Sequence, residues 1–257
     1  MTLFDGILLF GAAALAGAMN SVAGGGSFIS FPILIFTGVP PIPANATSTV
    51  ALWPGSVAAI RAYGNKLPRS ARLLVPLTIS SVAGGLMGAL VLLRTPEATF
   101  MRLVPYLFLV ATILFTFGKQ LSRWVGVHLK ISGALSWGAM GGAATVQLLI
   151  AIYGGFFGGG IGILMLALLA MIQMEDIHRM NALKSLLAAA INGAAVVTFI
   201  VARAVFWRQA MLMIVGAVLG GYGGASLAQR IDPRWVRSFV IVVGFSMTAY
   251  FFWNSRI

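Results

Sequence analysis

The sequence predicts an all-α polytopic membrane protein made of two homologous halves. Of its 257 residues, 60% are hydrophobic and 9% are charged, whereas soluble domains carry about 25% charged residues. The mean hydropathy is +0.98. Apolar runs of about twenty residues recur along the chain, enough for each to cross a hydrocarbon core roughly 30 Å thick. The runs are continuous rather than alternating, which indicates helices and not the strands of a barrel.

The first half is predicted to contain a broken helix followed by three long ones. In order, the expected helices cover about residues 3–22, 27–37, 44–62, 72–93 and 99–118. Three glycines, Gly24–Gly26, separate the first two. Residues 27–37 are half a bilayer long, about 17 Å at 1.5 Å per residue. Pro40, Pro41 and Pro43 form the next turn, since proline disrupts a helix interior but suits a first turn.

The second half repeats this order. The expected helices cover about residues 131–153, 161–173, 177–201, 209–228 and 235–253. Glycines from Gly154 to Gly160 interrupt the first two, and Asp176 is expected to cap the third. The polar segment 119–130 is expected to join the halves.

Constant spacing between matching residues indicates an internal repeat. The separation of Asn45 from Asn181 equals that of Gly84-Gly85 from Gly220-Gly221, and the glycine triplets are separated by almost the same length of chain. We therefore expect one transmembrane transporter domain over 1–257, with repeat 1 at about 3–118 and repeat 2 at about 131–253. Each repeat has four segments if a broken pair counts as one.

The relative orientation of the repeats stays open at this stage. Lys and Arg divide between the two sides equally well for parallel and for inverted repeats, and both place residues 61–72 and 119–130 in the cytoplasm. Paired half-length segments favour inverted repeats with glycine-led, broken or re-entrant helices.

Composition excludes several functions. The chain has no cysteine and a net charge of +12, so disulfides and thiol chemistry are ruled out. The basic residues lie in short loops, which is typical of membrane orientation rather than of nucleic-acid binding. The first apolar run lacks a basic start and continues into the glycine triplet, so we interpret it as a mature helix and not a signal peptide.

The two glycine-led breaks predict a polar site inside the membrane. Irregular backbone at that depth persists only where protein or a water-filled cavity satisfies it. Glycine amides and the positive end of a half-helix suit an anion. The expected backbone ligands are Gly24, Gly25, Gly26, Gly159 and Gly160. The alternative is that these glycines serve only helix packing.

Polar residues at the following helix starts are expected to complete the site. The first half offers Asn45, Ser48 and Thr49, and the matching positions of the second half offer Asn181, Lys184 and Ser185. Lys184 lies inside an apolar run, so it either meets the anion or extends to the interface. Asn20, Ser21 and Asn192 are further residues that would line the cavity.

Catalytic chemistry is not expected. His128 and His178 are far apart in sequence, the carboxylates fall at segment ends, and there is no phosphate-binding loop. We therefore predict no catalytic residue, no metal site, no cofactor and no enzyme activity.

Two runs resemble the sulfite exporter TauE/SafE family. They are GGGSFISFPILIFTGVPPIPANATSTVALWPGS from Gly24 and YGGFFGGGIGILMLALLAMIQMEDIHRMNALKSLLAAAING from Tyr153. Residues 44–48 match an Ala-x-x-Thr-Ser motif of the family, and residues 181–185 read Asn-Ala-Leu-Lys-Ser. The resemblance covers essentially the whole chain. It implies a bacterial inner-membrane permease for sulfite, organosulfonates or related small organic anions.

These observations together predict a secondary transporter that carries a small anion by alternating access. Its expected partners are the anionic substrate, the lipid bilayer, a coupling ion and further copies of itself, but not nucleic acid. An anion channel, or a membrane subunit or enzyme without transport activity of its own, is the alternative.

Overall fold

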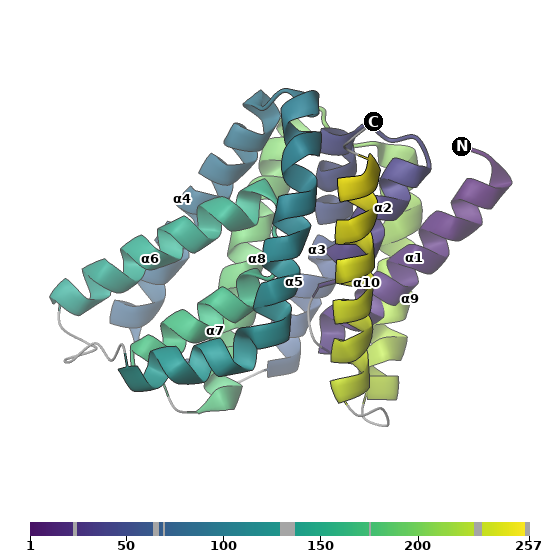
Figure 1. Cartoon of the computed structure of the whole chain (residues 1–257). Coiled ribbons are helices and arrows are strands. Elements are labelled where there is room, and N and C mark those ends of the chain that lie inside the picture. The colour runs from purple at the N-terminus through teal and green to yellow at the C-terminus, as the bar shows by residue number, and fades with distance from the viewer. Residues whose placement is uncertain are drawn as a thin grey trace.

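The protein is a bundle of helices in all the parts that the structure describes. The computed structural model describes residues 1–22, 25–63, 67–68, 70–128, 137–174, 176–228 and 233–254. The helices in these ranges are α1 (Leu3–Val22), α2 (Ser27–Phe36), α3 (Pro41–Tyr63), α4 (Ala71–Arg94), α5 (Glu97–His128), α6 (Trp137–Phe156), α7 (Ile161–Met171), α8 (Ile177–Val201), α9 (Trp207–Ala228) and α10 (Pro233–Asn254) (Figure 1).

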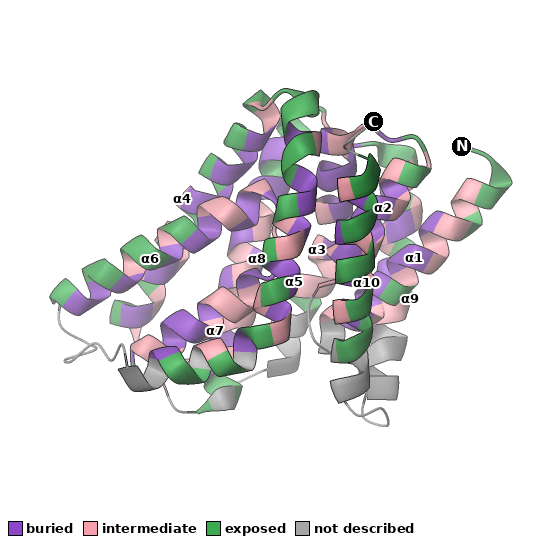
Figure 2. Cartoon of the chain, in the orientation of Figure 1, coloured by how far each residue is buried: buried purple, intermediate pink, exposed green. Residues whose placement is uncertain are grey.

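Helix length and surface composition identify a membrane protein, as predicted. Five of the described helices contain apolar stretches of at least 18 residues: α1, α4, α5, α6 and α8. Large apolar residues such as Ile79, Leu149 and Val242 are exposed, and exposed positions recur along the helices of the bundle (Figure 2). Such a surface is stable against lipid and not against water. The chain is therefore a multi-pass membrane protein.

Two short helices lie at corresponding points of the chain. Helices α2 and α7 are 10 and 11 residues long, and each follows a glycine turn after a long helix. The core around α2 is aromatic, since Phe31 is fully buried against Phe108, Phe157 and Phe251. This packing holds a short helix inside the bundle although it cannot span the membrane alone.

Helix contacts occur in matching pairs when α1–α5 is compared with α6–α10. Helix α1 packs against α9 as α6 packs against α4, and α3 packs against α9 as α8 packs against α4. Similarly, α2 contacts α10 and α7 contacts α5. Helices α3 and α8, the third helix of each of these two sets, pack against each other.

Helices α3 and α8 run in opposite directions. Near the start of α3, Thr47 Oγ1 accepts a hydrogen bond from the amide of Phe206, which follows the end of α8. Farther along α3, Trp53 Nε1 donates to the carbonyl of Ala189, in the middle of α8, at 3.0 Å. Figure 1 shows the same arrangement, with α3 starting at the upper end of the bundle and α8 at the lower end. Both chain termini lie at the upper end.

Glycines bring the long helices into backbone contact. A Cβ atom added at Gly85 would lie 2.5 Å from the carbonyl oxygen of Ile191 in α8. A Cβ atom added at Gly88 or Gly155 would overlap the backbone of the partner helix in the α4–α6 contact. One added at Gly17 or Gly220 would do so in the α1–α9 contact. Small residues allow this close approach, and it replaces the hydrophobic driving force that lipid does not provide.

Three predicted boundaries were wrong. Most of the segment 119–130, predicted to join the halves, is helical, because α5 continues to His128. The last part of α5 turns aside and runs along α7 (Figure 1). Lys and Arg are good helix formers, and Val125 is buried. Helix α3 begins at Pro41 rather than at 44, since proline is accepted in a first turn. Helix α6 continues through Gly154 and Gly155 to Phe156, because both glycines serve helix contacts. The predicted start of this helix, 131–136, lies outside the described residues.

Candidate functional site

The first glycine turn is closed by a side chain from α1. Gly25 has φ +89°, a backbone conformation that glycine adopts more readily than other residues. The amide of Gly26 donates to Asn20 Oδ1 at 2.9 Å. The amides of Phe28, Ile29 and Ser30 donate to the carbonyls of Gly25 and Gly26. The start of α2 is therefore largely satisfied by the protein itself. Gly24 lies outside the described residues.

A pair of buried serines links this turn to α3. Ser30 and Ser48 are 0% and 1% exposed, and their hydroxyl oxygens are 2.6 Å apart. Ser30 Oγ also donates to the carbonyl of Gly26 at 3.2 Å. Ser48, a predicted ligand, is thus held by Ser30. Ser30 was missed by sequence reasoning, although a serine in an otherwise apolar run one turn after Gly26 was an available signal.

Asn45 connects the first half to the second. Its side chain is 3% exposed, and Nδ2 donates to the carbonyl of Phe156 at 3.1 Å. Phe156 is the last residue of α6, just before the second glycine turn. Thr49 Oγ1 donates back to the carbonyl of Asn45 at 2.8 Å. Asn45 therefore anchors the chain where the second turn begins.

The second glycine turn has a different geometry from the first. The amides of Phe157 and Gly158 donate to the carbonyl of Tyr153 at 2.9 and 3.3 Å. Gly158 and Gly160 have φ +83° and +77°, whereas Gly26 is in the right-handed helical region at φ −56°. In the part of the chain described, no residue accepts a hydrogen bond from the amide of Gly159 or Gly160. The start of α7 therefore keeps backbone donors available.

A lysine of α8 lies beside the first turn of α7. Lys184 Nζ donates to Asn181 Oδ1 at 3.1 Å, and Ser185 Oγ donates to the carbonyl of Asn181 at 2.9 Å. A Cβ atom added at Gly162, in the first turn of α7, would lie 3.4 Å from Lys184 Cδ. Lys184 is half-buried and forms no ion pair with a carboxylate among the described residues. Its charge and the dipole of α7 have the same sign at this point.

The predicted ligands therefore fall into two groups. Asn181, Lys184 and Ser185 lie together in one turn of α8 beside the start of α7. Ser48 lies with Ser30 and Gly26 beside the start of α2. The hydrogen bond from Asn45 to Phe156 links α3 to the second group. An unpaired positive charge together with free amide donors can hold an anion. Of the two groups as far as the structure describes them, the one at the start of α7 has both.

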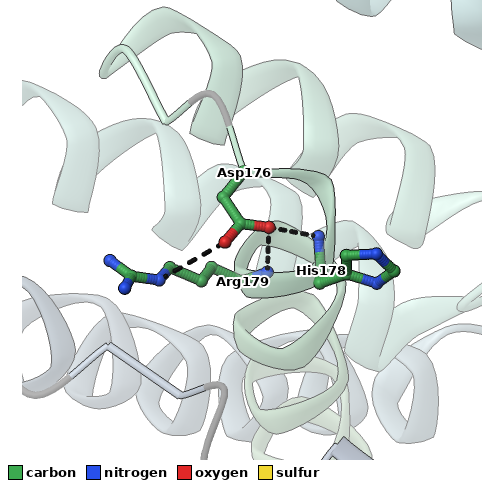
Figure 3. Close-up of polar contacts among 3 residues, drawn as sticks. All are labelled: Asp176, His178 and Arg179. Carbon is green, nitrogen blue, oxygen red and sulfur yellow. Dashed lines mark hydrogen bonds and ion pairs between the residues drawn. The ribbon is translucent and has the colours of Figure 1, made fainter.

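A pocket on the described surface lies elsewhere, at the start of α8. It is about 270 Å³ in volume and is lined by Pro68, Leu73, Gln173, Met174, Asp176 and Arg179. Asp176 caps α8, as predicted, accepting hydrogen bonds from the amides of His178 and Arg179 at 2.9 and 3.3 Å (Figure 3). These bonds hold the pKa of Asp176 below its usual range. The Asp176 carboxylate of this pocket is therefore occupied by capping α8 and by its ion pair with Arg179, and none of the six lining residues belongs to the glycine turns.

Comparison with known proteins supports a transport role. The chain is 25% identical to the "Probable membrane transporter protein" of Haemophilus influenzae, over 94% of this chain and 92% of that protein. It is also 25% identical to the "Probable membrane transporter protein YfcA" of Escherichia coli K12, over 97% of this chain and 90% of that protein. A relative from Sinorhizobium, "Probable membrane transporter protein ORF9", is 25% identical over 93% of this chain and 89% of its own length.

No solved structure matches the chain. The family model described as "Sulfite exporter TauE/SafE" matches residues 9–251, which is nearly the whole sequence. This match includes both glycine turns and the group formed by Asn181, Lys184 and Ser185. The chain belongs to the sulfite exporter TauE/SafE family.

Proposed function

We propose that the protein is a secondary transporter of a small anion, with sulfite or an organosulfonate as the first candidates. The observation that carries this proposal is the position of Lys184 beside the start of α7. A charged lysine inside a membrane helix costs about 2.5–3.5 kcal/mol on insertion scales. That cost is offset when an anion pairs with it, and free amides at Gly159 and Gly160 would share the charge.

Alternating access follows from the arrangement that we infer for the halves. We infer that they are inverted repeats, since matching residues have constant spacing and the matching helices α3 and α8 run antiparallel. Rocking of one half against the other about the α3–α8 contact would open the site to each side in turn. The relatives named above come from bacteria, which supports a place in a bacterial inner membrane.

Transport assays on reconstituted protein test this proposal. Liposomes containing the purified protein should take up radiolabelled sulfite, and uptake should saturate and show counterflow, which a channel would not. Lys184→Met should raise the KM for sulfite at least tenfold. Arg94→Met, at the exposed end of α4, serves as the matched control and should leave uptake unchanged. Uptake that is unaffected by Lys184→Met would contradict the assignment of the site.

A purified protein with no uptake of sulfite, thiosulfate, sulfonates or carboxylates would contradict transport of small anions altogether. It would instead support a membrane subunit that needs a partner.

A further inference from the structure

We propose that each chain binds one anion, at the turn between α6 and α7, because Asn20 takes the anion's place at the equivalent turn between α1 and α2. This inference rests on the proposed function. It concerns the number of sites and the reason why two similar glycine turns act differently.

The first turn contains its own acceptor. Asn20 Oδ1 lies 2.9 Å from the amide nitrogen of Gly26, and Gly26 precedes the first residue of α2. An anion bound to this helix start would place an oxygen on the same amide. The carboxamide oxygen provides that hydrogen bond without a full charge, so the first half meets the need of its helix start from within the chain.

At the second turn, no described residue takes the part that Asn20 plays at the first. Aligning the two glycine triplets matches Gly160 to Gly26 and, at the same offset, Gly154 to Asn20. The position of the capping side chain therefore holds a glycine. A Cβ atom there would lie 2.9 Å from Ile191 Cγ2. The packing of α6 on α8 thus leaves little room for a capping side chain, and the amides stay available.

The two halves also differ in charge, and this difference too favours anion binding in the second half. The alignment that matches Asn45 to Asn181 also matches Ser48 to Lys184. Ser48 is buried and paired with Ser30 at 2.6 Å, so the first half closes this position with two neutral hydroxyls. Lys184 instead brings a positive charge that the Asn181 side chain contacts and no described carboxylate neutralises. Available amides and an unpaired charge thus both occur at the start of α7, and the described residues at the start of α2 lack this combination.

Counting bound anions tests the inference. Equilibrium binding of radiolabelled sulfite to the purified full chain in nanodiscs should saturate at one sulfite per chain. Lys184→Met should weaken this site at least tenfold and reveal no second site. Asn20→Asp keeps the acceptor oxygen, and Asn20→Ala removes it; both should keep the second-half site within about twofold of the wild-type Kd.

Three results would overturn the inference without contradicting the binding of sulfite itself. The first is two sulfites per chain in the wild type. The second is a site of unchanged affinity in Lys184→Met. The third is loss of sulfite binding in both Asn20 variants when their circular dichroism and thermal unfolding match the wild type. Absence of any bound sulfite or sulfonate in the wild type would instead contradict the proposed function itself.

Discussion

Asn45, a predicted ligand of the anion, also joins two distant parts of the chain. Its matching residue, Asn181, accepts a hydrogen bond from Lys184. Asn45 instead donates to the carbonyl of Phe156, in the other half of the chain, at 3.1 Å. The same residue type at equivalent positions therefore has two roles. One orients a charge, and the other fixes the end of α6 from which the second glycine turn starts.

Removing the Asn45 side chain should destabilise the second turn. In Asn45→Ala the carbonyl of Phe156 loses its donor, which costs about 1–3 kcal/mol and lowers the Tm by several degrees. Thr145→Val is the control, because Thr145 is exposed and donates only within its own helix, to Gly141. Thermal unfolding in detergent measures the Tm of both variants, and hydrogen exchange at residues 157–160 measures the stability of the second turn. Equal Tm values for the two variants would show that the Asn45 contact is unimportant.

Asp176 should give one pH-dependent contribution to stability. Amide hydrogen bonds lower its folded-state pKa from 3.8, so the charged form is favoured in the folded protein. Its contribution is present above the unfolded pKa and is lost as the pH falls through the lowered folded pKa. Asn also caps helices, so the Tm difference between wild type and Asp176→Asn should shrink as the pH is lowered from 6 to 3. A Tm difference that stays constant from pH 6 to pH 3 would show that ionisation of Asp176 does not contribute to stability.

At the scale of helices, glycine placement separates contact faces from lipid faces. Gly141, Gly142 and Gly155 all lie in α6. A Cβ at either of the first two would meet no atom within 4 Å, whereas at Gly155 it would overlap the carbonyl of Gly85 in α4. The sequence alone gives no reason to distinguish these three glycines. Their positions in the bundle give them opposite sensitivities to substitution.

Alanine substitutions along α6 should therefore have opposite effects. Gly155→Ala should lower the Tm strongly, because the α4 and α6 backbones must separate. Gly141→Ala should leave the Tm unchanged or raise it slightly, because alanine is favoured over glycine in a helix by roughly 0.5–1 kcal/mol. Parallel thermal unfolding of the two purified variants decides the matter. A similar loss in both would mean that close packing of α4 on α6 does not limit stability.

At the scale of the whole molecule, the helix arrangement predicts which parts of the chain share a side of the membrane. Both termini lie at the end of the bundle where α3 starts, and the α7–α8 connection lies at the opposite end (Figure 1). This topology can be tested directly, because the natural chain has no cysteine and single cysteines can be introduced without background.

Cysteines at Thr2 and Asn254 should react with a membrane-impermeant maleimide from the same side of intact vesicles. A cysteine at Gln173, which is exposed between α7 and α8, should react only from the other side. Labelling before and after permeabilisation gives the side for each position. Reaction of all three from one side would contradict the arrangement of the helices.

Much of this protein could be predicted from its sequence because membrane helices are local features. Hydropathy, run length and glycine or proline breaks indicated the long helices, the short helices α2 and α7, and the cap at Asp176. The constant spacing between the halves paired Asn45 with Asn181 and Ser48 with Lys184. At 119–128 the local composition gave a wrong prediction of a polar connection between the halves. This basic segment is helical, and its Val125 packs inward.

The tertiary structure alone decided what each half of the candidate site does. No property of the local sequence places Asn45 on Phe156 or Trp53 on Ala189, since these contacts join residues far apart in the chain and depend on how helices cross. The same holds for Asn20, whose side chain reaches Gly26 only because α1 and α2 fold back on each other. The sequence by itself determined a helical membrane protein with two glycine turns and one embedded lysine. Packing decided that the Asn20 side chain closes the first turn. It also decided that the Gly159 and Gly160 amides have no described acceptor, and that Lys184 lies against Gly162 in the first turn of α7.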